Sequence, residues 1–147
     1  MPNEQTEKLW LAITLAGKGY ATWSAAHGMS EYFSTVLCEL YINPGQSQRQ
    51  LIDHTGYPKQ SVNKAVKQLR DQGYLTVSVD PQDNRVKVCT LTPAGRKLAK
   101  EELAPLFRIE ERTAKQFGDD KMNQLVHLAE EWSQLFWKSL RREEDEK

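Results

Sequence analysis

The chain has 147 residues, of which 39% are hydrophobic and 27% charged, and its formal net charge is zero. This length fits one domain, or one domain with an appended assembly element, and the composition is ordinary for a soluble globular protein. The first residues form no basic leader, and the apolar run at residues 9–16 is too short to span a bilayer, so we expect a cytoplasmic protein. The two cysteines, Cys38 and Cys89, exclude a disulfide framework.

The zero net charge conceals an uneven distribution. Residues 44–100 contain ten Lys or Arg against four Asp or Glu, a net charge of +6, so the remainder of the chain carries −6. A basic centre between acidic ends can face phosphates on one side while the rest of the molecule stays soluble. The distribution therefore favours a nucleic-acid partner.

Two helices are expected before residue 46. Residues 4–24 place apolar or aromatic side chains three and four positions apart, which predicts a helix with one apolar face. Ser30 can cap a second helix, and the turn at residues 43–45 ends it.

A tightly spaced pair of helices follows. Ser47 and Gln50 have the spacing of a capping box, so a third helix begins there, and Gly56 ends it as a left-handed cap. Pro58 is tolerated in the first turn of a fourth helix, which Gly73 ends. Two helices joined by so short a turn predict a helix-turn-helix.

A β-hairpin and two further helices complete the chain. Residues 75–79 alternate with period two, residues 80–84 are turn formers, and residues 86–91 form the return strand. Thr92 caps a fifth helix, which Gly118 separates from a sixth. The predicted fold class is mainly α with a small β-hairpin, a winged helix-turn-helix with helices added at both ends.

The fourth helix has the division of faces that a DNA-reading helix needs. Val62, Ala65, Val66 and Leu69 repeat at helical spacing and should face the core. The side chains expected to face outward together are Gln60, Asn63, Lys64 and Lys67. Gln and Asn can pair with adenine edges, and Lys can reach guanine or phosphate. On this helix alone, a merely solvated face is an equal alternative.

The hairpin tip adds an exposed arginine. Asp80 and Asp83 flank the turn before Arg85, and a carboxylate there can fix the direction of a guanidinium. Such an arginine can enter a narrow minor groove. The alternative is a surface ion pair of little energetic value.

Residues 30–100 resemble the winged helix-turn-helix of the MarR family of bacterial transcriptional regulators. The matching segments are Gln46 to Leu51, Ser61-Val62, Leu69 to Leu75, the wing Asp80 to Arg85, and the exit Leu91 to Gly95. The terminal helices fit the family layout as well. The resemblance implies a homodimer that binds a palindromic operator in double-stranded DNA, usually to repress, and often releases DNA on meeting a small aromatic ligand or an oxidant. Two departures are Gln82, where the wing often has a basic residue, and Pro58, where a capping serine is common.

The implied organisation has three segments: an N-terminal dimerisation helix at residues 1–29, a DNA-binding lobe at 30–100, and C-terminal dimerisation helices at 101–147. Broad apolar stripes on the first, fifth and sixth helices favour this dimer over a monomer in which those helices pack on their own domain. The predicted DNA-binding residues are Ser47, Arg49, Lys59, Gln60, Ser61, Asn63, Lys64, Lys67, Asp83, Arg85 and Lys87.

Regulation is the least determined feature. The aromatic residues Tyr20, Trp23, Tyr32, Phe33 and Tyr41 either line a pocket for a planar anionic effector or form plain core and dimer packing, which we favour. Cys38 and Cys89 have apolar neighbours, so core packing is favoured over a thiol-based redox sensor.

Other classes of protein fit less well. The histidines show no metal-ligand spacing, so we expect no metal and no cofactor. The sequence has no nucleophile elbow, P-loop or dinucleotide turn, so an enzyme is not expected. A winged helix serving as a protein-interaction module is the main alternative, but the polar, basic face of the fourth helix argues against it.

Overall fold

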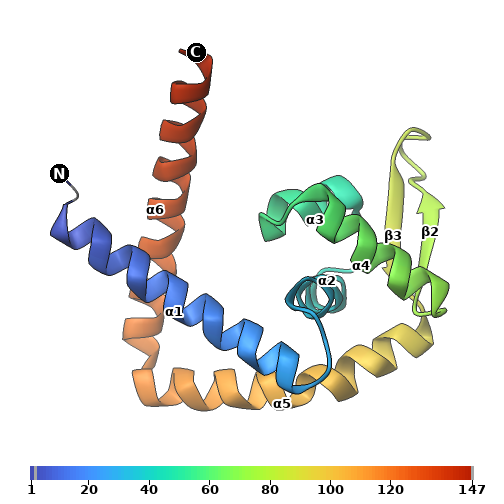
Figure 1. Ribbon diagram of the computed structural model, residues 1–147. Coiled ribbons are helices and arrows are strands. Elements are labelled where there is room, and N and C mark those ends of the chain that lie inside the picture. The colour runs from blue at the N-terminus through green and yellow to red at the C-terminus, as the bar shows by residue number, and fades with distance from the viewer. Residues whose placement is uncertain (2, 147) are drawn as a thin grey trace. The chain divides into compact units, whose positions relative to one another are not determined.

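The computed structural model describes residues 1 and 3–146, which fold into helices and a small antiparallel sheet (Figure 1). In chain order the elements are α1 (Glu4–Ala26), α2 (Glu31–Ile42), β1 (Gln46–Ser47), α3 (Gln48–Thr55), α4 (Lys59–Asp71), β2 (Leu75–Val79), β3 (Lys87–Leu91), α5 (Pro93–Phe117) and α6 (Asp119–Asp145). The predicted fold class, mainly helical with a β-hairpin wing, is confirmed.

The sheet contains one strand more than the sequence predicted. Its order is β1-β3-β2, with Gln46 of β1 opposite Cys89 and Leu75 of β2 opposite Leu91. The two-residue strand β1 has no local sequence signal, because it exists only through its pairing with β3, more than 40 positions away.

The predicted helix boundaries follow from capping. Ser30 accepts a hydrogen bond from the Phe33 N–H (3.1 Å), and Ser47 with Gln50 forms a complete capping box. Gly56, with φ of 67°, ends α3 in the left-handed region, where a side chain would be strained. The chain therefore leaves α3 and enters α4 within three residues.

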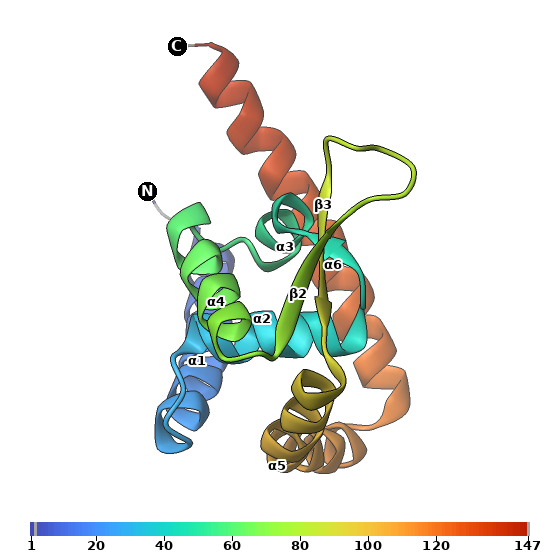
Figure 2. The same cartoon turned by 90° about the vertical axis from the view of Figure 1, so that its right-hand side faces the viewer.

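The structure divides into two units, Met1–Ala104 and Pro105–Lys147. Within the first, α2 lies at the centre, with α3 and α4 against it and the hairpin at the edge (Figures 1 and 2). The largest fully buried side chains of this unit are Leu37, Leu40, Leu51, Leu69 and Leu103, with Val36, Val62, Val66 and Cys89 between them.

The start of α5 is fixed tightly against the chain that enters the sheet. The Thr92 hydroxyl donates to the Gly73 carbonyl (2.8 Å) and accepts from the Gly95 N–H (3.0 Å). The Thr92 N–H donates to the Tyr74 carbonyl (3.0 Å). A Cβ atom added to Gly95 would lie 2.0 Å from that same carbonyl oxygen, so only glycine fits there.

The second unit contains the later part of α5 and all of α6. Gly118, with φ of 96°, separates the two helices, and the chain bends sharply between α5 and α6 (Figure 1). None of the described residues of α6 is buried, although the helix has many apolar side chains. The large exposed ones are Leu125, Val126, Leu128, Trp132, Leu135, Phe136 and Trp137.

Candidate nucleic-acid interface

Helix α4 places its apolar residues in the core and most of its polar ones outside. Val62, Ala65, Val66 and Leu69 are buried. Of the predicted reading residues, Lys59, Gln60, Lys64 and Lys67 are exposed, whereas Ser61 and Asn63 are half-buried at the flanks of the helix. This exposed face is basic and includes an amide side chain that can form hydrogen bonds with the edge of a base.

Asn63 differs from the other outward residues of the sequence pattern. Its Oδ1 atom is buried and has no hydrogen-bond partner among the described residues. A helical wheel places this residue at the edge of the apolar face, where neighbouring side chains cover it. Of the two amides on the predicted reading face, Gln60 is thus the one that solvent, and a base edge, can reach directly.

Lys67 is engaged with an acidic neighbour one turn further along α4. Its Nζ donates to Asp71 Oδ2 at 2.5 Å. This hydrogen bond holds the pKa of the Asp71 carboxyl below its usual value. The positive charge of Lys67 is therefore partly neutralised, while Lys64 has no ion-pair partner in the described part of the chain.

Helix α3 begins at the interface. The Ser47 hydroxyl accepts from the Gln50 N–H (3.1 Å), and the Gln50 side chain accepts from the Ser47 N–H (2.9 Å), so both are occupied by the cap. Arg49, one position into the helix from its first residue, is exposed. The N-terminal turn of α3 thus presents a guanidinium beside backbone N–H groups, a combination that suits a phosphate.

The wing is a compact turn built on two aspartates. Asp80 accepts from the Gln82 N–H (2.8 Å), and Asp83 accepts from the Arg85 N–H (3.0 Å). The Arg85 side chain is 94% exposed, and its Nε lies 3.6 Å from Asp83 Oδ1. Asp83 thus acts mainly on the backbone, which turns the arginine outward, and Lys87 follows at the start of β3, also exposed.

A cavity of about 760 Å³ lies between the start of α3, the end of α4 and the hairpin. Four cationic side chains line it: Arg49, Arg70, Arg85 and Lys87. None of the described residues that line the cavity is acidic, and part of its wall is apolar, including Val77 and Cys89. Cations from three elements that are separate in sequence therefore converge on one concave surface.

Arg70 is the residue of this surface that sequence reasoning missed. It lies in the last turn of α4, where a basic side chain is ordinarily explained by the helix dipole. Its position beside the hairpin depends on how α4 packs against the sheet, which a helical wheel does not contain. The excess of basic residues between positions 44 and 100 was the only sequence signal for it.

The predicted aromatic group is spread over several contacts. Trp23 stacks on His27 (4.3 Å between ring centroids), Tyr32 meets Tyr57 edge-on (4.8 Å), and Arg96 lies 5.2 Å from the Tyr41 ring centroid. Phe33 is buried and Tyr20 is exposed. The Trp23 Nε1 atom is buried without a hydrogen-bond partner among the described residues.

The cysteines and other candidate chemistry can be placed as well. Cys89 is fully buried and Cys38 half-buried; burial raises the pKa of the Cys89 thiol, although the nearby Arg70 acts in the opposite direction. Within residues 1 and 3–146, no cluster of His, Cys, Asp or Glu could hold a metal ion. No helix that these residues form is long and apolar enough to cross a membrane.

A helix-turn-helix with an exposed basic helix, a basic wing and a basic cavity between them defines the winged-helix class of nucleic-acid-binding folds. Sequence and fold comparisons bear on the predicted resemblance to a family. Residues 34–85 match the sequence model of the MarR family. No curated protein matches the chain by sequence.

Solved structures of known regulators share the fold. A MarR-family regulator from Neisseria meningitidis, NMB1585, superposes with a TM-score of 0.83 at 21% identity, covering 95% of this chain and 99% of its own. BpsR of Bordetella bronchiseptica, whose DNA binding is regulated by 6-hydroxynicotinic acid, gives 0.68 at 23% identity over 90% of this chain and 98% of its own. PcaV of Streptomyces coelicolor, solved with its natural ligand, superposes with a TM-score of 0.68 at 20% identity, covering 91% of this chain and 96% of its own. The predicted resemblance to the MarR family is confirmed by sequence over residues 34–85, and the fold is shared with these structures over nearly the whole chain.

Proposed function

We propose that this protein is a sequence-specific DNA-binding transcriptional repressor that binds a palindromic operator in double-stranded DNA as a homodimer. The convergence of Arg49, Arg70, Arg85 and Lys87 on one concave surface beside the exposed face of α4 carries the proposal. Phosphates are the ligands that such a surface suits, because each cation can neutralise one and release counterions. The protein acts in the cytoplasm by binding rather than by catalysis.

In the proposed complex, α4 enters the major groove and the wing reaches the adjacent minor groove. Gln60 and Lys64 face base edges, and Arg85 enters the minor groove, where negative potential is concentrated. The cations of the cavity hold the sugar-phosphate backbone that runs between the two grooves. Two copies of α4 then occupy successive major grooves, roughly 34–36 Å apart.

The homodimer is supported by apolar surface that the monomer leaves exposed. Trp10, Ile13 and Leu15 of α1 are each more than half exposed. Several large apolar side chains of α6 are exposed to a similar extent. Isolated soluble proteins seldom leave so many large apolar side chains of one helix in water, and a second copy supplies a matching surface by symmetry.

An effector is the final part of the proposal. BpsR and PcaV, which share the fold, respond to or bind small ligands. By analogy, we propose that a small aromatic acid binds near the aromatic residues of α1 and α2 and lowers DNA affinity. The buried, unpartnered Trp23 Nε1 is a donor that such a ligand can engage.

Fluorescence anisotropy tests the DNA-binding proposal. We would titrate the full chain into duplex DNA from upstream of its own gene, with competitor DNA and over a salt series. Arg85→Ala should weaken binding and reduce the salt dependence by about one unit of slope. Lys18→Ala, which removes a cation from an exposed position on α1, should change neither. If the duplex and duplexes selected from a random-sequence pool bind no better than competitor, the proposal is wrong.

Base reading requires a separate comparison. Gln60→Ala should relax preference at one operator position, costing about 1–3 kcal/mol there. Lys67→Ala should weaken all sequences alike. If Gln60→Ala lowers affinity without changing the preference, then α4 does not read bases through this residue.

A further inference from the structure

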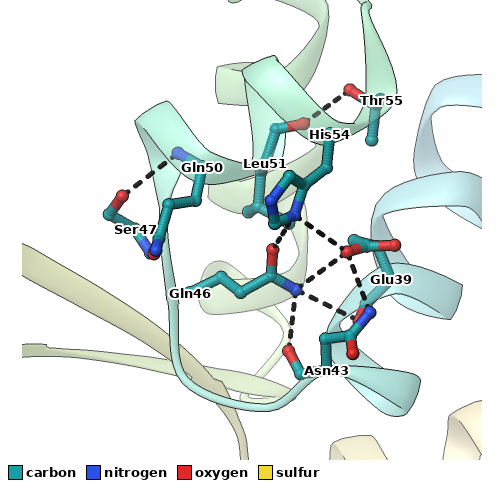
Figure 3. Close-up of polar contacts among 8 residues, drawn as sticks. All are labelled: Glu39, Asn43, Gln46, Ser47, Gln50, Leu51, His54 and Thr55. Atoms are coloured by element: carbon teal, nitrogen blue, oxygen red, sulfur yellow. Dashed lines mark hydrogen bonds and ion pairs between the residues drawn. The ribbon is translucent and has the colours of Figure 1, made fainter.

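One polar cluster of the first unit lies outside the interface described above. Its members are Glu39 and Asn43 at the end of α2, Gln46 of β1 and His54 of α3, and Figure 3 shows them gathered around the Gln46 amide. We propose that Gln46 is a positioning residue for DNA binding, whose side chain holds α3 so that Arg49 faces a phosphate. The inference rests on the proposed function, which it extends by a residue that itself touches no DNA.

Gln46 lies where four elements of the first unit meet. It pairs with Cys89 of β3, and it directly precedes Ser47, the residue that caps α3. Its side chain reaches the end of α2 and the last turn of α3, and only 5% of the residue is exposed (Figure 3). One buried residue therefore connects α2 and the strand β3 with both ends of α3.

The amide nitrogen of Gln46 closes the C-terminal end of α2. It donates to the Asn43 carbonyl oxygen (2.7 Å) and to Glu39 Oε1 (3.1 Å), and the Glu39 carbonyl oxygen lies 3.3 Å away. The last carbonyls of a helix lack partners within the helix, so donors from elsewhere must satisfy them. Asn43, the C-cap residue of α2, obtains such a donor from β1. The central helix of the lobe is thus the support to which the entrance of α3 is attached.

The amide oxygen of Gln46 binds the other end of α3. It lies 2.8 Å from His54 Nδ1, and an amide oxygen can only accept, so the ring nitrogen donates. The position therefore requires a donor toward α2 and an acceptor toward α3 within one side chain. Methionine has a similar length but lacks both groups, and glutamate would turn an acceptor toward the acceptors of α2.

This attachment fixes the direction of the first cation of α3. Arg49 follows Gln46 by three positions and lines the basic cavity. Strand β1 pairs with β3 through two residues only, so the contacts of the Gln46 side chain supply most of the support for the entrance of α3. Arg85 does not depend on these contacts, because the wing is formed by β2 and β3, which pair along five residues.

The test is the salt dependence of DNA affinity, because its slope reports how many phosphates the protein neutralises. The probe is a duplex that the full-length wild type selects from a random-sequence pool, titrated between about 50 and 200 mM salt. Gln46→Met removes no charge, yet it should reduce the slope by roughly one unit, since Arg49 leaves its phosphate. An unchanged slope would overturn the proposal.

Sequence preference supplies a second readout of the same variant. Phosphate contacts carry no sequence information, so Gln46→Met should lower affinity for the selected duplex and for a scrambled duplex by the same factor. A loss confined to the selected duplex would mean that Gln46 supports base reading by α4, and it would overturn the assignment to Arg49.

Double-mutant cycles identify the cation through which Gln46 acts. Arg49→Ala should lower the slope by about one unit in the wild type but hardly at all in the Gln46→Met background. Arg85→Ala should lower it equally in both backgrounds, because the wing is held by β2. Additive losses for Gln46→Met and Arg49→Ala, or no loss for Arg49→Ala in the wild type, would overturn the proposal.

A matched core variant separates positioning from stability. Val36 of α2 is fully buried, so Val36→Ala should lower the free energy of unfolding while leaving the salt slope unchanged. If Val36→Ala reduces the slope as much as Gln46→Met does, the effect belongs to stability and the positioning role is wrong.

His54→Ala keeps the inference testable if Gln46→Met does not fold. The His54 side chain is 53% exposed, and its removal deprives the Gln46 oxygen of its donor. The slope should decrease in the same direction, and this decrease should vanish when Arg49 is already alanine. Additive losses would mean that His54 contacts a phosphate itself, against the proposal. A wild type that binds no duplex better than competitor would instead overturn the proposed function.

Discussion

The winged-helix lobe and helix α6 differ in whether their apolar side chains are buried or exposed to solvent. The lobe buries a continuous apolar core of leucines and valines and presents polar and basic side chains outward. Helix α6 has apolar residues across a broad face, yet none of its described residues is buried. The lobe therefore contains the apolar contacts that its own folding requires, whereas α6 requires a surface from elsewhere.

The largest effect should come from opening the core of the lobe. Leu69 of α4 is fully buried, so Leu69→Ala leaves a cavity and should lower the free energy of unfolding by about 2–5 kcal/mol. Urea denaturation followed by circular dichroism measures it. A loss below about 1 kcal/mol would mean that α4 is not packed on a self-sufficient core.

The second prediction concerns α6. Trp132, 40% exposed, lies on the same helical face as Leu125 and Phe136, so Trp132→Ala should weaken the proposed homodimer by about 2–4 kcal/mol. Analytical ultracentrifugation measures the dissociation constant. Gln134→Ala, on the opposite face of α6, should leave it unchanged. A wild type that is monomeric at micromolar concentration would remove the contrast between α6 and the lobe.

A smaller effect is expected where the turn between α3 and α4 meets α2. The Tyr57 hydroxyl donates to Glu31 Oε1 (2.9 Å), so Tyr57→Phe should cost about 1–3 kcal/mol of unfolding free energy at neutral pH. Burial raises the pKa of Tyr57, so the folded state favours the neutral phenol. The stabilising contribution of the Tyr57 hydroxyl is complete at pH values below the ordinary pKa of tyrosine. It is lost as pH rises through the pKa that Tyr57 has in the folded state. Unfolding at pH 7 and about pH 11 should show the difference between wild type and variant shrinking.

The smallest effect is expected at the surface of the lobe. The Lys67 hydrogen bond lowers the pKa of Asp71, so the ionised carboxylate is favoured in the folded state. The stabilising contribution of the Asp71 carboxylate is present at pH values above the ordinary pKa of aspartate. It is lost as pH falls through the pKa that Asp71 has in the folded state. Asp71→Asn should therefore be slightly less stable than wild type at pH 7, and the two should converge in acid. A difference that persists at low pH would assign the effect to something other than this ion pair.

The features that could be predicted from the sequence are those that depend on local residue patterns. The capping box of Ser47 and Gln50, the helix ends at Gly56 and Gly73, and the aspartate-rich wing turn depend on residues within a few positions of one another. Strand β1 and the position of Arg70 beside the hairpin depend on pairing and packing between distant segments. The same holds for the cluster around Gln46, whose members come from α2, β1 and α3.

The exposure of most candidate interface residues was accordingly predictable from the sequence, whereas their arrangement in space was not. The period of α4 identified its exposed face, yet it assigned Asn63 the same outward position as Gln60. The packing around the helix decides such flanking positions. The roles of the predicted DNA-binding residues stay predictions until binding is measured.

The contact between Gly95 and Tyr74 gives a criterion for recognising this junction in other sequences. A β-carbon at that position would overlap the Tyr74 carbonyl oxygen. A homologue with any other residue there must have moved the start of α5 away from the strand entrance. It would then lose the hydrogen bonds that Thr92 makes to both sides. One glycine therefore serves as a genetic marker of how the first turn of α5 is attached to the winged helix, and the amino-acid sequence of a homologue is enough to read it.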